Sequence, residues 1–197
     1  MIESSQMVSD VVRSYHSRIS RALESFDLTQ VSTLVDALNA ARKSGRTVFV
    51  VGNGGSASTS GHFVIDWAYG SGLSNPPLRV VSLADSSPAI TATGNDQSFE
   101  RVFLRQLETH GKSGDLLIMI SASGNSPNLL TLLPFCKAHE IQIIAMTGFD
   151  GGELKRNADI SIHVETELGD YGVAEDLHLM IGHITKEALI VSATGGD

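Results

Sequence analysis

Thr47-Val-Phe-Val-Val51 is a run of β-branched and aromatic residues, and Gly52-Asn-Gly-Gly-Ser-Ala-Ser58 follows it directly. A run without polar alternation is typical of a strand buried on both faces of a sheet. Further on, Leu116-Leu-Ile-Met-Ile120 runs into Ser121-Ala-Ser-Gly-Asn-Ser126 in the same way. Both stretches predict a buried strand, a turn of small polar residues and then a helix.

The chain from residue 46 onward repeats this alternation. Strands are predicted at Thr47–Val51, Leu78–Leu83, Asp115–Ile120, Gln142–Met146 and Asp159–Val164. Helices are predicted at Ser58–Tyr69, Phe99–Thr109, Pro127–Ala138, Glu153–Arg156 and Ala174–Val191. The alternation indicates an α/β fold of three layers, a five-stranded parallel sheet flanked by helices. Such sheets bind ligands beyond the carboxyl ends of their strands.

Residues 1–45 are predicted to form an N-terminal helical pair that precedes the main domain, residues 46–197. Apolar residues recur at helical spacing in both helices: Val11, Val12, Tyr15, Ile19 and Leu23, then Val31, Leu34, Val35 and Leu38. Asp27 is a plausible N-cap for the second helix, and Gly45 ends it. We expect the pair to pack on the main domain or on a neighbouring subunit.

The composition limits the class of protein. The 197 residues suit one compact domain, and a net charge of -8 without a Lys/Arg-rich run argues against nucleic-acid binding. No apolar run reaches the ~18 residues that a membrane span needs, and no secretory signal is visible. The single cysteine, Cys136, forms no intrachain disulfide. We expect a cytoplasmic protein that does not bind membranes.

We call residues 52–58 and 121–126 the first and second polar loops. Glycines let a ligand approach the backbone, and the N-terminus of the following helix favours an anion. The loops therefore predict a phosphate site without Lys or Arg. The first loop also fits a dinucleotide fingerprint, Gly52-x-Gly54-x-x-Ala57, but the acidic residue expected about 20 positions later is not clearly placed. A redox enzyme is the weaker interpretation.

Two groups of side chains are candidates for chemistry. His62 and Asp66 lie four residues apart on one predicted helix, so they share a face and are able to bind a metal or move protons. The last helix carries Glu175 and His183, roughly 12 Å apart along the helix axis. Either both lean inwards to share one metal, or they serve sites built with different subunits.

The last helix is apolar on two sides. A helical wheel puts Leu177, Met180, Ile181, Ile184 and Ala188 opposite Glu175. Leu179, Gly182 and Ile190 accompany the polar residues on the other side. We expect burial on both sides, with a neighbouring subunit near Glu175 and His183.

Six segments taken together resemble one family over about residues 5 to 191. They are Gly52-Asn-Gly-Gly-Ser56, His62-Phe63, Gly94-Asn95-Asp96, Ser121-Ala-Ser-Gly-Asn-Ser126, Thr147-Gly-Phe-Asp-Gly-Gly152 and Glu175-Asp-x-His178…His183. In this order they resemble the phosphoheptose isomerases, also called sedoheptulose 7-phosphate isomerases, of the SIS fold. The resemblance implies an aldose–ketose isomerase of a phosphorylated sugar, acting through an enediol as a homotetramer with sites between subunits.

The resemblance also implies residue roles. Substrate or phosphate contacts fall on Asn53, Gly54, Gly55, Ser56, Asn95, Asp96, Ser121, Ala122, Ser123, Ser126 and Glu175. The positions of the metal ligands, for zinc or another divalent ion, are occupied by His62, Asp66, Glu175 and His183. Asp66 takes the position of the family's base, and His183 that of the acid.

Departures from the family pattern leave alternatives open. Asp66 stands where the family usually has glutamate, Glu175 where it has glutamine, and Gly172 where it often has aspartate. The changes are compatible with an isomerase of a different sugar phosphate. A non-catalytic regulator resembling the DnaA initiator-associating protein is a second alternative, against which the presence of both His62 and His183 argues. A sugar-phosphate sensor is a third, although no DNA-binding module is visible.

Overall fold

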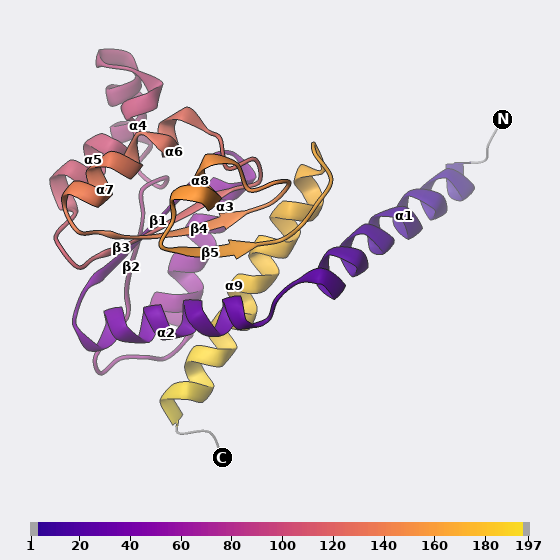
Figure 1. The fold of residues 1–197 in the computed structure, drawn as a ribbon, viewed down its shortest axis with the longest axis horizontal. Coiled ribbons are helices and arrows are strands. Elements are labelled where there is room, and N and C mark those ends of the chain that lie inside the picture. Colours follow the sequence, from indigo (N-terminus) through magenta and orange to yellow (C-terminus); the bar gives the residue numbers. More distant parts are fainter. Residues whose placement is uncertain (1–3, 195–197) are drawn as a thin grey trace.

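The computed structural model describes residues 4–194 and contains the expected five-stranded parallel sheet (Figure 1). The strands are β1 (Thr47–Gly52), β2 (Arg79–Ser82), β3 (Leu116–Ser121), β4 (Gln142–Thr147) and β5 (Ile160–His163). Their order is β2-β1-β3-β4-β5, and every neighbouring pair is parallel. The order reverses between β1 and β3, which is where open sheets of this kind bind ligands.

Helices cover both faces of the sheet, because successive strand residues point to opposite faces. One face packs on α2 (Thr29–Lys43), α3 (Gly55–Phe63) and α9 (Tyr171–Thr194). The other face packs on α5 (Leu104–His110), α6 (Pro127–Leu130), α7 (Leu132–Ala138) and α8 (Gly152–Asn157). Val50 and Ile118 belong to the first core, and Val51 and Met119 to the second. The predicted three-layer α/β fold is confirmed.

The N-terminal helices are present, and α1 (Ser4–Ser25) projects from the body of the molecule (Figure 1). Its C-terminal half contacts the body: Tyr15 and Ile19 pack against the core, and Tyr15 Oη donates a 2.7 Å hydrogen bond to Asp176 of α9. This bond raises the pKa of Tyr15 to about 12. In the N-terminal half of α1, the side chains of Val8, Val11 and Val12 continue the apolar stripe that contains Tyr15 and Ile19, and they are more than half exposed.

The helix predicted at Ser58–Tyr69 begins and ends differently from the prediction. It starts earlier, as α3, and continues from Val64 to Gly70 as a π-helical segment, η1. A π segment widens the turn and is often found at functional sites. Asp66 lies within η1, so its side chain points in a different direction from the one that a regular α-helix would give it.

One helix, α4 (Ser87–Asp96), was not predicted. The local signals were available, because Ser86 Oγ accepts a hydrogen bond from the N–H of Ala89 and Pro88 occupies the first turn. Most of α4 is exposed and it has no apolar stripe, so periodicity gave no sign of it. A helix without a buried face escapes pattern analysis.

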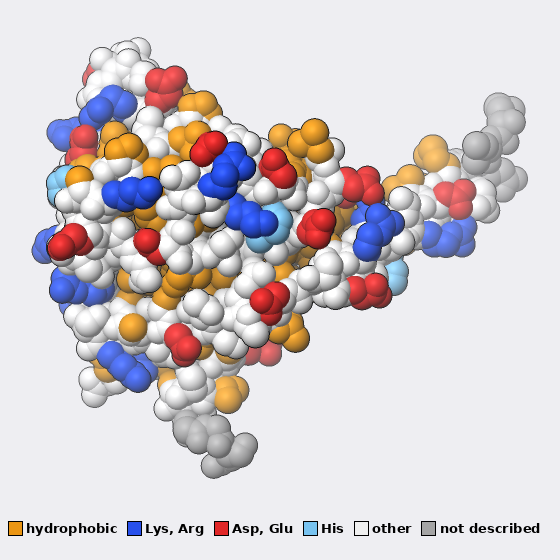
Figure 2. All heavy atoms as spheres, viewed as in Figure 1, with side chains coloured by type: hydrophobic (Ala, Val, Ile, Leu, Met, Phe, Trp, Pro, Cys, Tyr) orange, Lys and Arg blue, Asp and Glu red, His pale blue; other side chains and the backbone are white. Residues whose placement is uncertain are grey.

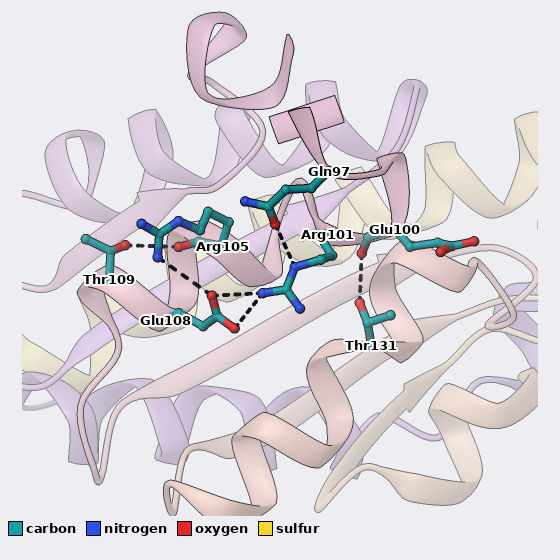
Figure 3. A network of polar contacts seen from close by, with 7 residues as sticks. All are labelled: Gln97, Glu100, Arg101, Arg105, Glu108, Thr109 and Thr131. Carbon is teal, nitrogen blue, oxygen red and sulfur yellow. Dashed lines mark hydrogen bonds and ion pairs between the residues drawn. The ribbon is translucent and has the colours of Figure 1, made fainter. Parts of the chain in front are cut away.

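The segment after α4 is held by polar contacts of Arg101 (Figure 3). Arg101 lies in a 3₁₀ turn, η2 (Phe99–Arg101), and its guanidinium donates to Gln97 Oε1 at 2.8 Å and to Glu108 Oε1 at 2.9 Å. Thr131 Oγ1 donates to the carbonyl of Glu100 at 2.9 Å. The predicted helix Phe99–Thr109 is therefore divided into η2 and α5, and its start is tied to the α6–α7 region.

The last helix is longer than predicted, and its buried side differs from the helical-wheel prediction. Ile184 is 43% exposed, whereas His178 and Thr185 are completely buried. The reason is that α9 lies across the sheet with the side containing Leu177, His178 and Ile181 inward. Ile184, which the helical wheel groups with Leu177 and Ile181, is therefore not buried within one chain.

Acidic and basic side chains are interspersed over the face shown in Figure 2. Over residues 4–194, none of the helices has the length and apolar character required to cross a bilayer.

Candidate functional site

The two polar loops lie side by side at the carboxyl ends of β1 and β3, which are hydrogen-bonded neighbours. A cavity of about 130 Å³ between them is lined by residues of both loops and of α9: Asn53, Ser56, Ser121, Ala122, Ser123, Ser126, Tyr171 and Glu175. The helix α3 begins at Gly55, so its unpaired N–H groups face this end of the sheet. The geometry suits a small anion such as phosphate.

Reciprocal amide hydrogen bonds join the two loops. Asn53 Nδ2 donates to Asn128 Oδ1 at 2.9 Å, and Asn128 Nδ2 donates to Asn53 Oδ1 at 2.8 Å. Asn128 is buried in α6, just after Ser126. A buried amide with both groups satisfied fixes its partner, so this pair sets the separation of the loops.

The Thr147–Gly152 segment supports the second polar loop from behind. The N–H of Gly148 donates to the carbonyl of Ala122 at 3.0 Å, and the N–H of Leu154 donates to that of Gly124 at 3.0 Å. Gly124 has φ +63°, and a Cβ there would overlap the carbonyl of Gly151. The glycine is therefore required by both conformation and close approach. The second polar loop and the Thr147–Gly152 segment therefore pack backbone against backbone.

A second group, the His62–Asp66–His183 cluster, lies where α3 and η1 pack on α9. The Nε2 atoms of His62 and His183 are 3.0 Å apart, and Asp66 Oδ2 is 3.4 Å from the first and 3.5 Å from the second. The imidazoles are about half exposed, whereas the Asp66 side chain is only 10% exposed. One ligand atom from each residue lies within 4.8 Å of the others.

The donor set of this cluster fits a divalent metal ion. Asp66 Oδ2 is buried and makes no hydrogen bond, although two imidazole nitrogens face it. Buried polar atoms are normally paired, so an orphaned carboxylate oxygen beside two nitrogens of this type calls for a cation. Two imidazoles and a carboxylate are ligands that zinc accepts, with a position left open.

Tight helix packing holds the cluster together. A Cβ on Gly182 of α9 would overlap the ring of Phe63, and the stacked indole of Trp67 donates through Nε1 to the carbonyl of Gly182 at 2.9 Å. The next residue along α9 is His183, which this contact brings to His62. Trp67 and Gly182 are far apart along the chain, so this contact could not be predicted from the sequence.

Within one chain, Glu175 lies against Gly55 and not in the His62–Asp66–His183 cluster. A side chain at Gly55 would overlap the Glu175 carboxylate, which lines the cavity between the polar loops. Gly55 therefore contacts Glu175 at one end of the α3–α9 pair, and His62 contacts His183 farther along. By helix rise, His62 is about 9 Å beyond Ser56. Both groups thus lie along the same pair of parallel helices.

Asn95 and Asp96 are not brought to the cavity by this chain. Both are exposed at the C-terminal end of α4, where Asn95 Nδ2 donates to Asp96 Oδ1 at 2.8 Å. A larger cavity of about 450 Å³ lies between α1 and the segment before α9. There Arg18 pairs with Asp170 at 2.6 Å. It holds none of the predicted site residues.

Sequence reasoning missed Asn128 and Lys186, which both contact site residues. Asn128 could have been noticed as the only amide in an apolar helix pattern. Lys186, whose Nζ is 3.1 Å from Asp66 Oδ1, had only its helical spacing from His183 as a signal.

Comparison with known proteins gives consistent matches. Residues 13–148 match one SIS-domain family model, and residues 108–191 match another. The phosphoheptose isomerase of Clostridium acetobutylicum is 40% identical over 159 residues, covering 80% of this chain and 79% of that protein. The one from Chlorobaculum parvum is 32% identical over 183 residues, covering 92% and 87%.

Solved structures show the same fold. A phosphoheptose isomerase from Francisella tularensis superposes with a TM-score of 0.84 at 24% identity, covering 95% of this chain and 98% of that one. The enzyme from Neisseria gonorrhoeae gives a TM-score of 0.82 at 23% identity, covering 95% and 99%.

Proposed function

Because the chain belongs to the SIS-domain family, and within it to the phosphoheptose isomerases, we propose that it interconverts sedoheptulose 7-phosphate and glycero-manno-heptose 7-phosphate. One observation carries the proposal. The residues of the His62–Asp66–His183 cluster lie on α3, on η1, which continues α3, and on α9. The N-terminal ends of α3 and α9 lie at the polar loops. A sugar with its phosphate between the loops can therefore extend its carbonyl end toward groups that exchange protons.

The phosphate is held by the loop serines Ser56, Ser121, Ser123 and Ser126 and by backbone N–H groups of Asn53, Gly54 and Gly55. Ala122 contributes backbone to the same cavity. Hydroxyl and amide donors bind an anion without a fixed positive charge, which suits a protein of net charge -8. Holding the phosphate fixes the distance from the sugar carbonyl to the cluster.

The reaction needs one proton to move between two neighbouring carbons. Asp66 takes the proton from C1 of the ketose, and the carbonyl oxygen takes a proton from His183, giving an enediol. The C1 hydroxyl then returns a proton to His183 while C2 receives the proton held by Asp66, and the aldose forms. The close contact of Asp66 Oδ2 with the His183 imidazole supports this division of roles.

His62, Asp66 and His183 would hold a zinc ion, or another divalent ion, which when bound polarises carbonyl and hydroxyl oxygens. Glu175 stays a predicted ligand or substrate contact. From its place beside Gly55, its carboxylate lies at the phosphate end of the proposed site.

The proposal includes a homotetramer with sites shared between subunits. A cavity of about 130 Å³ is small for a whole sugar phosphate, since small-molecule sites are usually about 300 Å³ or more. Asn95 and Asp96 are predicted contacts that the chain leaves exposed, and the apolar stripe of α1 continues beyond the body. A neighbouring subunit would complete the site and cover the stripe. The cytoplasm stays the predicted location, because the chain has one cysteine.

The direct test is conversion of sedoheptulose 7-phosphate by the purified protein, followed by NMR of the aldose anomeric proton. Parallel samples contain pentose and hexose ketose phosphates, and each is measured before and after chelation and zinc addition. We expect the heptose to be converted fastest and the chelator to abolish turnover. If only another sugar phosphate is converted, the protein is an isomerase of that sugar. If no sugar phosphate is converted with any divalent metal, the protein is a binding protein and not an isomerase.

A further inference from the structure

Lys186 contacts the buried Asp66 carboxylate of the cluster through a different oxygen from the one that faces the histidines. It lies on α9, three residues after His183, and its Nζ is 3.1 Å from Asp66 Oδ1. Asp66 Oδ2, the other oxygen, faces the two imidazoles without a hydrogen bond. The two oxygens of one carboxylate therefore have different partners.

The path of the lysine depends on a missing side chain. A Cβ on Gly70, the last residue of η1, would lie 3.1 Å from Lys186 Nζ and 3.2 Å from its Cε. It would also lie 3.2 Å from the carbonyl oxygen of Ile65. Gly70 thus leaves the space through which Lys186 reaches Asp66, and the lysine side chain is only 30% exposed.

We propose that Lys186 is a positioning residue: by engaging Asp66 Oδ1, it makes Asp66 present Oδ2 alone to a divalent ion at His62 and His183. The inference rests on the metal site of the proposed function. A carboxylate with both oxygens free can bind an ion through both. With Oδ1 hydrogen-bonded to an ammonium group, Asp66 would supply one oxygen to the ion and keep the second lone pair of Oδ1 for the proton that it takes in the proposed reaction. The coordination number would stay low, as in zinc sites that keep a position open for substrate.

Positioning and simple charge predict opposite results when the lysine is removed. The ammonium group repels a nearby cation, so removing its charge alone would strengthen metal binding. Loss of a group that orients a ligand weakens metal binding, typically 10- to 100-fold. The sign of the change in affinity therefore separates the two roles.

The experiment measures zinc affinity of the metal-free full chain by competition with a chromophoric chelator, without substrate. We expect K186M to bind zinc about 10- to 100-fold more weakly. K186R, which keeps a charged donor with a different shape, should bind zinc more tightly than K186M. K43M, which removes an exposed lysine at the end of α2, is the control for charge and should bind normally. Unchanged or tighter binding by K186M would overturn the proposal.

Cobalt(II) gives a readout of geometry, because its visible bands are intense in four-coordinate sites and weak at higher coordination. We expect the cobalt form of K186M to lose band intensity and that of K186R to retain it. G70A keeps every charge but crowds Lys186, and it should shift the spectrum and zinc affinity in the same direction as K186M. Normal spectra and zinc affinity for both K186M and G70A would refute the positioning role of Lys186. If K186M does not fold, the result for G70A alone tests that role.

These measurements use no sugar, so they separate this inference from the proposed function. A protein that binds zinc in a lysine-dependent way but converts no sugar phosphate would refute the isomerase and keep the role of Lys186. A protein that isomerises the heptose phosphate but binds neither zinc nor cobalt would refute the role of Lys186.

Discussion

The indole Nε1 of Trp67 donates a buried hydrogen bond of 2.9 Å to the main-chain carbonyl of Gly182. This bond crosses from η1 to α9, and each partner is next to a residue of the cluster: Asp66 precedes Trp67, and His183 follows Gly182. The stacked ring of Phe63 fills the space that a side chain at position 182 would need. This helix contact thus helps to set the relative position of Asp66 and His183.

Replacing Trp67 with Phe should disturb that contact without changing any proposed catalytic group. The lost hydrogen bond should lower the free energy of unfolding by about 1 kcal/mol, plus a contribution from the smaller ring. Turnover should fall while the Michaelis constant for substrate changes little, since the polar loops are untouched. Urea unfolding followed by circular dichroism and steady-state kinetics measure both. Equal stability and turnover would show that the contact does not position His183.

Removing a proposed proton-transfer group should have a larger and more specific effect. We expect His183→Ala and Asp66→Asn each to lower turnover by at least ~10²-fold, the usual contribution of a general acid or base. His110→Ala, at the exposed end of α5, serves as the control and should be fully active. If either variant keeps near-normal turnover at saturating substrate and zinc, that residue does not transfer a proton.

The serines of the second polar loop should affect binding more than turnover. Ser121→Ala and Ser123→Ala each remove a hydroxyl from the cavity, and the Michaelis constant should rise about tenfold, as expected for a lost hydrogen bond to a charged group. Ser121 Oγ also accepts from the N–H of Gly124 at 3.1 Å, so its loss should be the more severe. Ser113→Ala, at the other end of β3, is the control. Unchanged binding in both loop variants would exclude the phosphate role.

The projecting part of α1 gives a test of self-association. Met7, Val8, Val11 and Val12 are between 53% and 60% exposed, although their stripe continues that of Tyr15 and Ile19. Val11→Asp should place a charge in the predicted interface and reduce the tetramer to smaller species in analytical ultracentrifugation. Ser17→Asp, about 120° from Val11 on the helix and opposite the centre of the apolar stripe, should leave the mass unchanged. A tetramer that withstands Val11→Asp would place the interface elsewhere.

The fold was predictable because its strands are buried on both faces and interrupted by helices with apolar stripes. Val48 and Val50 point to one core and Phe49 and Val51 to the other, so all four of these positions in β1 had to be apolar. The carboxyl ends of β1 and β3 could then be assigned to the polar loops. Helix α4 could not be predicted in this way, because it buries almost nothing.

The site was predictable only where residues are close in sequence or share a helix. His62 and Asp66 were paired by spacing, but the sequence did not indicate the π turn that sets the direction of Asp66. Contacts between distant segments, such as Asn53 with Asn128 or Asp66 with Lys186, depend on how the helices pack. Glu175 shows the same limit, because its place beside Gly55 follows from the parallel packing of α3 and α9.

His178 predicts how stability depends on pH. Its imidazole is fully buried in α9 and neither ring nitrogen is hydrogen-bonded. Burial lowers its pKa to about 4 from the ordinary value of 6.5, against a smaller raising effect of the Thr147 backbone, and the nearby His163 lowers it further. Between these two pH values the unfolded chain binds a proton that the folded chain does not. Stability from this group is therefore complete above pH 6.5 and is lost as the pH falls toward 4.

Between pH 7 and pH 5 the loss from His178 should be about 2 kcal/mol in the free energy of unfolding. His178→Leu, which keeps a buried side chain of similar size without a titrating group, should remove most of this pH dependence. Urea unfolding at both pH values and equal protein concentration measures it. The pKa of the partly buried His163 is also lowered by burial, so a smaller dependence should remain. If the variant loses as much stability as the original protein, a different group controls acid unfolding, because leucine at position 178 binds no proton.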